Sequence, residues 1–154
     1  LLVRRGATLR PMLRGGGQQR GLRPGTEPAA LIVGLAAAVS LAVSPLEENV
    51  ARLRQLRQVF WDGLRDAGPV LSSPQDGLPH VLNVSFPGLK SDALVIALDL
   101  AGVACSAGAA CASGSLLPSP VLRAMGLPEA QVRSSVRFSL GRQQTAEEVR
   151  EAAA

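Results

Sequence analysis

A cysteine in a run of small residues is the first candidate for chemistry. Residues 106–115 consist of Ser, Ala and Gly apart from Cys111. These side chains offer no apolar pocket for the sulfur, and they leave the backbone free to move, which suits a nucleophile that approaches a bound substrate. The alternative is a thiol buried as a packing residue. Cys105, which follows Val103 and Ala104, fits that second interpretation better.

An arginine in an alternating segment is the second candidate. Apolar and polar residues alternate over residues 135–140, so Arg137 is expected on the face opposite Val136 and Phe138. A guanidinium flanked by serine hydroxyls can hold a carboxylate through two parallel hydrogen bonds. A solvated arginine on an exposed strand face explains the same pattern equally well.

A glycine-rich segment, residues 15–26, is the third candidate. It contains Arg20 and Arg23 and ends at Thr26, just before an apolar stretch. Backbone N–H groups and a threonine hydroxyl at the start of a helix suit a phosphate group, and Thr26 is the expected cap of that helix. The segment is not a P-loop, because the Gly-Lys-Ser/Thr ending is absent.

The composition limits which functions are possible. The chain has 154 residues, 47% hydrophobic and 18% charged, which favours a packed core over disorder. The net charge of +4 comes from residues 1–26, which carry six arginines, no acid and no aromatic side chain for stacking on bases, so we expect no nucleic-acid partner. Two cysteines and His80 fall short of the four ligands of a structural zinc site, so no metal is expected.

Residues 29–43 are apolar except for Ser40 and raise the question of a membrane. This stretch is shorter than the roughly 20 residues that a spanning helix needs, so we interpret it as a buried helix and expect no membrane partner. A chain with only two thiols fits a reducing, cytoplasmic setting. An organellar transit peptide remains an alternative for the arginine-rich start.

Helix-start signals and alternating segments together predict an α/β fold. The expected helices cover residues 29–43, 44–68, 91–100, 119–126 and 145–154. The expected strands cover the strand end at residues 1–5, residues 80–86 and 132–140, and a short buried piece at 103–105. In the second helix, Ser44 and Glu47 form a predicted capping box, and Glu48 and Arg52 a predicted ion pair.

Four segments resemble, in this order, cysteine desulfurases of the NifS/IscS type. They are residues 15–26, 106–115, 118–126 and 134–142. The resemblance implies the C-terminal part of a fold-type-I, pyridoxal-5'-phosphate-dependent transferase of the aminotransferase class V family. It assigns residues 1–45 to the tail of the large cofactor-binding domain. Residues 46–154 would then be the small α/β domain, with a mobile cysteine loop at residues 106–117.

The resemblance also implies an activity and its site residues. The family is homodimeric, removes sulfur from L-cysteine and releases L-alanine. Cys111 matches the nucleophile that becomes a persulfide and passes sulfur to an acceptor or an iron-sulfur scaffold protein. Arg137 matches the arginine that holds the substrate carboxylate. Thr26 matches the threonine that contacts the cofactor phosphate of the other subunit.

The departures from the family concern the cofactor. The Schiff-base lysine of the family is not in this chain, because the only lysine, Lys90, matches a surface turn. His80 matches no catalytic histidine, and Glu27-Pro28 replaces the more usual Glu-Asn. We therefore expect the chain alone to be inactive. A selenocysteine lyase and a catalytically incomplete remnant that acts only in dimerisation or interaction remain alternatives.

Overall fold

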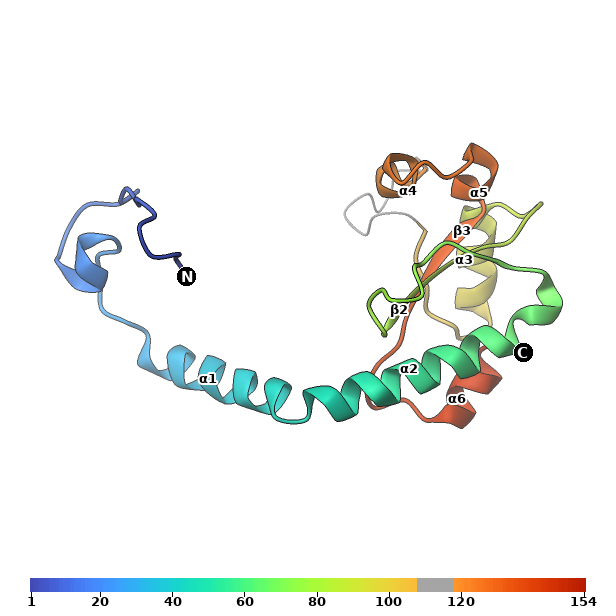
Figure 1. The fold of residues 1–154 in the computed structure, drawn as a ribbon, viewed down its shortest axis with the longest axis horizontal. Helices are drawn as coiled ribbons and strands as arrows, with labels where there is room; N and C mark the ends of the chain where they lie inside the picture. The colour runs from blue at the N-terminus through green and yellow to red at the C-terminus, as the bar shows by residue number, and fades with distance from the viewer. Residues whose placement is uncertain (108–117) are drawn as a thin grey trace. The chain divides into compact units, whose positions relative to one another are not determined.

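The computed structural model describes residues 1–107 and 118–154, which form two compact units, Leu1–Pro45 and Leu46–Ala154 (Figure 1). The first unit contains the 3-10 helix η1 (Gln18–Gly21) and helix α1 (Ala29–Val43). The second unit contains a small sheet and its helices: α2 (Leu46–Gly63), η2 (Arg65–Ala67), β1 (Val70–Leu71), β2 (Val81–Ser85), α3 (Ser91–Leu100), α4 (Pro120–Ala124), α5 (Glu129–Arg133), β3 (Ser135–Ser139) and α6 (Ala146–Glu151). The predicted α/β class is confirmed.

The sheet of the second unit is antiparallel, in the order β1-β2-β3. Leu82 pairs with Phe138, and Val84 pairs with Val136, so the apolar residues of β2 and β3 share one face. All four are buried. Successive side chains of a strand point to opposite faces of the sheet, so the alternation of apolar and polar residues predicted both of these strands.

The core lies between that sheet face and the helices. Leu56 and Phe60 of α2 and Val149 of α6 are buried in it, and the rings of Phe60 and Phe138 meet edge to face with centroids 4.8 Å apart. Helices α2 and α6 lie side by side (Figure 1). Because the described part of the sheet has three strands, these helices supply much of the apolar surface that buries its inner face.

Two predicted helix starts are confirmed. At α6, the Thr145 Oγ1 accepts a hydrogen bond from the Glu148 N–H at 3.2 Å, and the Glu148 carboxylate accepts one from the Thr145 N–H at 2.7 Å. This is the reciprocal arrangement of a capping box. At α4, the Ser119 Oγ accepts from the Leu122 N–H at 3.4 Å, with Pro120 in the first turn.

The first unit corrects three predictions. Helix α1 has the predicted bounds, but its expected burial is wrong, because every one of its residues is exposed. Thr26 is not the cap: the N-cap position is Pro28, which makes no side-chain cap bond. Residues 1–5 form no strand, because no described segment pairs with them and a strand needs a partner for its backbone groups.

The second helix also departs from its predicted start. Ser44 is the C-cap of α1, in helical conformation with its N–H bonded to the Ser40 carbonyl at 3.0 Å, so it does not begin a capping box. Arg52 does not pair with Glu48. Its guanidinium instead donates to the Arg142 and Gln144 carbonyls at 3.2 and 2.7 Å, which join α2 to the segment before α6.

Two strand predictions are also corrected. Residues 132 and 133 belong to α5, so β3 starts at Ser135. The predicted strand was too long because an apolar residue every second or third position fits a short helix as well as a strand. Residues 103–105 form no strand, and the bridge to β3 is made by the next residue, Ser106.

Among the described residues, no single helix is long and apolar enough to cross a membrane, and α1 and α2 meet that criterion only as a pair across a break.

Candidate active site

The site is built around Arg137, in the middle of β3. Its neighbours Val136 and Phe138 are buried on the core face, so the arginine side chain belongs to the opposite face, where it is half-buried. The Nε atom is buried and has no hydrogen-bond partner among the described residues. A buried guanidinium nitrogen without a partner is costly, and a bound carboxylate would satisfy it.

The backbone of Arg137 is tied to Ser106 by two hydrogen bonds. The Ser106 N–H donates to the Arg137 carbonyl at 3.0 Å, and the Arg137 N–H donates to the Ser106 carbonyl at 2.7 Å. The Ser106 Oγ is likewise buried with no partner among the described residues. Two polar groups with unused hydrogen-bonding capacity therefore belong to one pair of bridged residues. Sequence reasoning found Arg137 but missed Ser106.

Asn83 is the cross-strand partner of Arg137 on β2. Its Oδ1 accepts a hydrogen bond from the Ser135 Oγ at 2.8 Å, and its N–H donates to the Ser73 Oγ at 2.7 Å. The amide of Asn83 is thus fixed by the strand that carries Arg137. Sequence reasoning gave Asn83 no role in the site.

A second set of polar contacts supports the same sheet face. The Ser85 Oγ donates to the Gln131 carbonyl at 3.0 Å, and the Gln131 Nε2 donates to the Ser72 Oγ at 2.9 Å. Ser85 is fully buried, so its hydroxyl must have a partner within the protein. These bonds join β2, the loop after β1 and the middle of α5, which fixes the support on which Arg137 lies.

Of the two cysteines, only Cys105 is among the residues that the structure describes. Cys111, the expected nucleophile, lies outside the described residues, as does most of the expected loop 106–117. The described start of that loop, Ser106, is bonded to Arg137. Cys105 packs against the core, as predicted, and burial together with the charge of Asp99 raises the pKa of its thiol. Cys105 is therefore kept in the less reactive thiol form.

Thr26 lies in the first unit and is exposed. The segment before it bends through Gln19 and Arg20, which have φ angles of 50° and 60°, a left-handed conformation that is unfavourable for residues with a side chain. The Gln19 Nε2 donates to the Glu27 Oε1 at 3.1 Å, and this bond, followed by one from the backbone and the charge of Arg23, lowers the pKa of Glu27.

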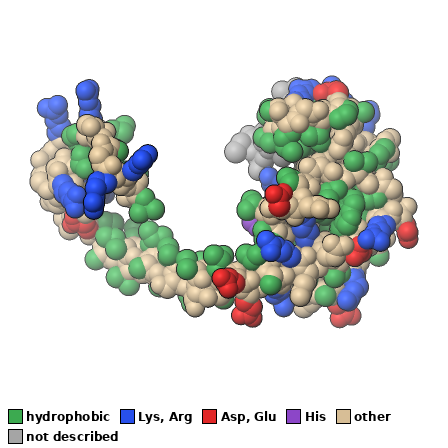
Figure 2. Space-filling model, in the orientation of Figure 1, with side chains coloured by type: hydrophobic (Ala, Val, Ile, Leu, Met, Phe, Trp, Pro, Cys, Tyr) green, Lys and Arg blue, Asp and Glu red, His purple; other side chains and the backbone are tan. Residues whose placement is uncertain are grey.

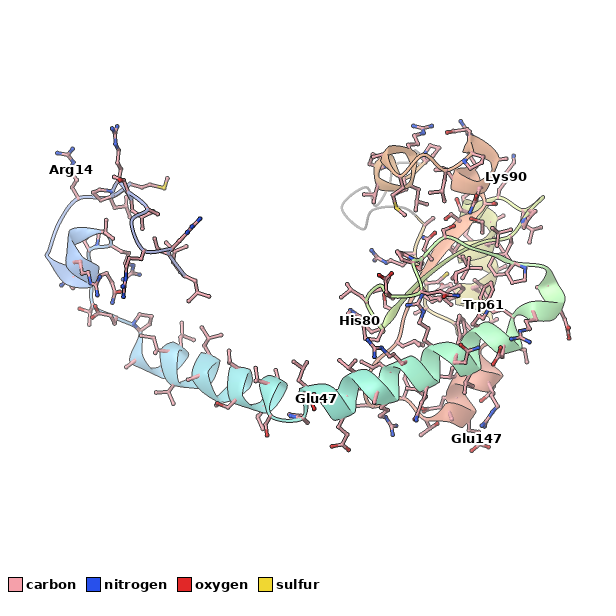
Figure 3. All side chains as sticks on the ribbon, viewed as in Figure 1. Arg14, Glu47, Trp61, His80, Lys90 and Glu147 are labelled. Carbon is pink, nitrogen blue, oxygen red and sulfur yellow. The ribbon has the colours of Figure 1, made fainter. Side chains whose placement is uncertain are left out.

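The remaining ionisable candidates do not fit a covalent cofactor site. Lys90, labelled in Figure 3, is exposed in the turn before α3, where it is the N-cap residue. Its side chain takes part in none of the hydrogen bonds described above around Arg137. His80 is half-buried before β2, and its carbonyl accepts from the Leu140 N–H at 2.8 Å. The described residues include no cluster of three His, Cys, Asp or Glu side chains suited to a metal ion.

Comparison with known proteins identifies the family. Residues 6–151 match the family model of aminotransferase class V. The chain belongs to the aminotransferase class V family. Over 97% of its own length, this class V chain is 44% identical to the cysteine desulfurase IscS of Enterobacter sp. (strain 638). Over the same share of its length, it is 41% identical to the cysteine desulfurase NifS of Azotobacter vinelandii. The predicted resemblance is confirmed.

Other relatives of this class V chain agree. It is 46% identical, over 94% of its length, to the putative cysteine desulfurase IscS 1 of Bacillus subtilis (strain 168). A solved NifS-like protein superimposes on 98% of the chain with a TM-score of 0.82 at 34% identity. The chain spans only 37 to 39% of the length of these relatives, so it corresponds to a part of each.

Proposed function

We propose that this chain supplies the substrate-carboxylate clamp and the sulfur-accepting thiol of a cysteine desulfurase. The observation that carries the proposal is the identity of 41 to 46% to cysteine desulfurases over nearly the whole chain. It is joined by the half-buried Arg137, whose Nε has no partner among the described residues. A carboxylate bound there would receive the unused guanidinium hydrogen bonds.

The proposed chemistry begins at Cys111. Its thiolate attacks the sulfur of L-cysteine, so that a sulfur–sulfur bond forms as the carbon–sulfur bond of the substrate breaks. The electron pair of the broken bond stays with carbon, which gains a proton and leaves as L-alanine. Cys111 then carries a persulfide, whose outer sulfur passes to the thiol of an acceptor, such as an iron-sulfur scaffold protein.

Pyridoxal 5'-phosphate is the cofactor that the family implies, and it supplies an electron sink next to the substrate amine. Lys90 does not fit as its covalent anchor, so the anchor has to come from outside this chain. Thr26 fits a contact to the phosphate, because it is exposed beside a glycine-rich segment with Arg20 and Arg23. As in the family, that phosphate would belong to the other subunit of a homodimer in the cytoplasm.

The deciding experiment uses an enzyme that contains this chain together with the lysine-bearing part. A cysteine desulfurase releases alanine from L-cysteine and acquires a persulfide that alkylating reagents label. Release from selenocysteine but not from cysteine would favour the selenocysteine lyase. Release from neither substrate, by a folded enzyme with bound cofactor, would leave the non-catalytic interaction module.

The chain alone makes a second test possible. Mixed with pyridoxal 5'-phosphate, it is expected to acquire no absorbance that borohydride abolishes, because Lys90 is exposed and lies outside the site. Specific borohydride-dependent labelling of Lys90 would contradict this assignment. Mass spectrometry of a digest, with free lysine as the positive control for labelling, decides between the two results.

A further inference from the structure

A groove in the second unit is lined by arginines, and Arg137 is not among its lining residues. It has a volume of about 550 Å³ and runs between α2 and the loop that connects β1 to β2. Its described lining contains three arginines and no acidic residue: Arg54, Arg57 and Arg65. A volume of this size is in the range of binding clefts.

The arginines follow one face of the helix. Arg54, Arg57, Trp61 and Arg65 are spaced by three or four positions, which aligns their side chains along the helix and its 3-10 extension. At a rise of about 1.5 Å per residue, the stripe is about 16 Å long, which matches about five residues of an extended peptide. Trp61 packs against the core and forms part of the wall (Figure 3).

The hydrogen bonds of the groove show which charges are available. The Arg57 guanidinium donates to the Pro74 and Leu78 carbonyls at 2.9 and 3.3 Å, so it holds the loop against α2. Arg65 forms an ion pair with Asp62. Arg54 is exposed and has neither a carboxylate nor a carbonyl partner among the described residues.

We propose that this groove binds an extended acidic segment of a partner protein. Arginine pairs with carboxylates in bidentate geometry, and the guanidinium of Arg54 is available for such a pair. Arg57 and Arg65, which have partners within the protein, add positive charge along the same groove. The half-buried Trp61 ring gives an apolar surface beside the charges, a combination typical of peptide-binding sites. The inference is independent of the proposed desulfurase activity, because no residue of the groove belongs to the candidate active site.

Trp61 provides a direct measurement. It is the only tryptophan, and the chain has no tyrosine, so the intrinsic emission reports on the groove. Titration of the full chain with a blocked hexaglutamate peptide is expected to change the emission saturably, and binding should weaken as the salt concentration rises. Anisotropy of a dye-labelled hexaglutamate detects binding that leaves the emission unchanged.

The decisive variant is Arg54→Glu, which should weaken hexaglutamate binding at least tenfold. Arg150→Glu is the matched control, because Arg150 is an exposed arginine on α6 outside the groove and should change binding less than twofold. If circular dichroism shows that Arg54→Glu does not fold, Arg54→Gln against Arg150→Gln decides the question.

Three results would overturn the inference. The first is no binding of hexaglutamate by either method. The second is an equal loss in the Arg54 and Arg150 variants, which would mean that only the net charge matters. The third is full competition by inorganic phosphate at the concentration of the peptide, which would mean that the groove takes a simple anion.

Discussion

The guanidinium of Arg137 differs from those of the surface arginines in its surroundings. Arg123 and Arg133 bind Glu129 in the open, and the pKa of Glu129 is lowered chiefly by the hydrogen bond from Arg123. Arg137, by contrast, is half-buried and has a buried Nε without a described partner. Exposed ion pairs contribute little to stability, whereas a partly desolvated guanidinium favours binding of a carboxylate.

Replacing Arg137 tests that difference. In an enzyme that contains the lysine-bearing part, we expect Arg137→Gln to lower kcat/KM for alanine release from L-cysteine by about 30-fold or more, because loss of a hydrogen-bonded charge pair costs about 2 to 5 kcal/mol. Arg133→Gln is the control and should leave kcat/KM unchanged. An unaltered KM and kcat in Arg137→Gln would remove the carboxylate role.

The two thiols make a second matched pair at this scale. Cys111→Ser should reduce alanine release by about 100-fold or more, because a serine hydroxyl does not accept sulfur. Cys105→Ser should retain activity, since Cys105 is half-buried against the core and its pKa is raised. Persulfide labelling followed by mass spectrometry identifies the thiol that carries sulfur. Label found on Cys105 instead would reverse the assignment.

At the scale of elements, the capping box of α6 is a local device whose contribution can be isolated. The Thr145 side chain satisfies the Glu148 N–H at the open end of a short helix. Replacement of such a cap by alanine costs about 1 kcal/mol. We therefore expect Thr145→Ala to lower the free energy of unfolding of the second unit by about 1 kcal/mol, measured by urea denaturation with Trp61 emission.

Thr26→Ala is the matched control, because Thr26 caps no helix and lies in the other unit. Its urea midpoint should equal that of the unaltered chain. Equal midpoints for Thr145→Ala and Thr26→Ala would mean that the cap does not stabilise the second unit.

The capping box of α6 also predicts that the stability of the second unit depends on pH. Hydrogen bonds from the Thr145 backbone and side chain lower the pKa of Glu148. A carboxyl group whose pKa is lower in the folded chain contributes stability above its unfolded pKa and loses it as the pH falls through the folded value. The urea midpoint should therefore fall on acidification, and less steeply in Glu148→Gln than in the unaltered chain. Parallel curves for the two chains would contradict this.

Elements set by a local sequence pattern could be predicted from the sequence, whereas contacts between residues far apart in the chain could not. The bounds of α1 and the alternating cores of the strands around Val84 and Arg137 were predictable, because an apolar run of 15 residues is too long for an ordinary strand and strict alternation has the period of a strand. The partners of Arg52 were not, because its carbonyl acceptors lie about 90 positions away in the chain. For the same reason, Arg137 was found by residue type, whereas Ser106 became visible only through the bridge.

At the scale of the whole molecule, the two units differ in how they bury apolar surface. The second has a closed core, whereas α1 of the first is apolar and exposed throughout, as the green side chains along this helix show (Figure 2). Leu31 and Leu35, one turn apart, are 73% and 67% exposed. An apolar helix surface of this kind is typical of an interface with another chain or domain.

We expect this surface to make the isolated chain self-associate. Light scattering after size exclusion should give a mass that rises with protein concentration, and the double variant Leu31→Lys/Leu35→Lys should shift it toward the monomer. Leu100→Lys is the control, since Leu100 is 85% exposed at the end of α3 and should leave association unchanged. A concentration-independent monomer mass for the unaltered chain would contradict the prediction.

The central position of β2 has a kinetic consequence for the second unit. β2 is bonded to β1 on one edge and to β3 on the other, and Val84 in its middle is fully buried. Each of its bonded amide protons is released only when the strand that accepts it separates, and separation of β3 opens the buried core around Val84. Deuterium should therefore enter β2 at the rate of global opening, while the exposed amides of the first unit exchange through local fluctuations. The slowest protons of the chain then measure the stability of the scaffold that holds Arg137.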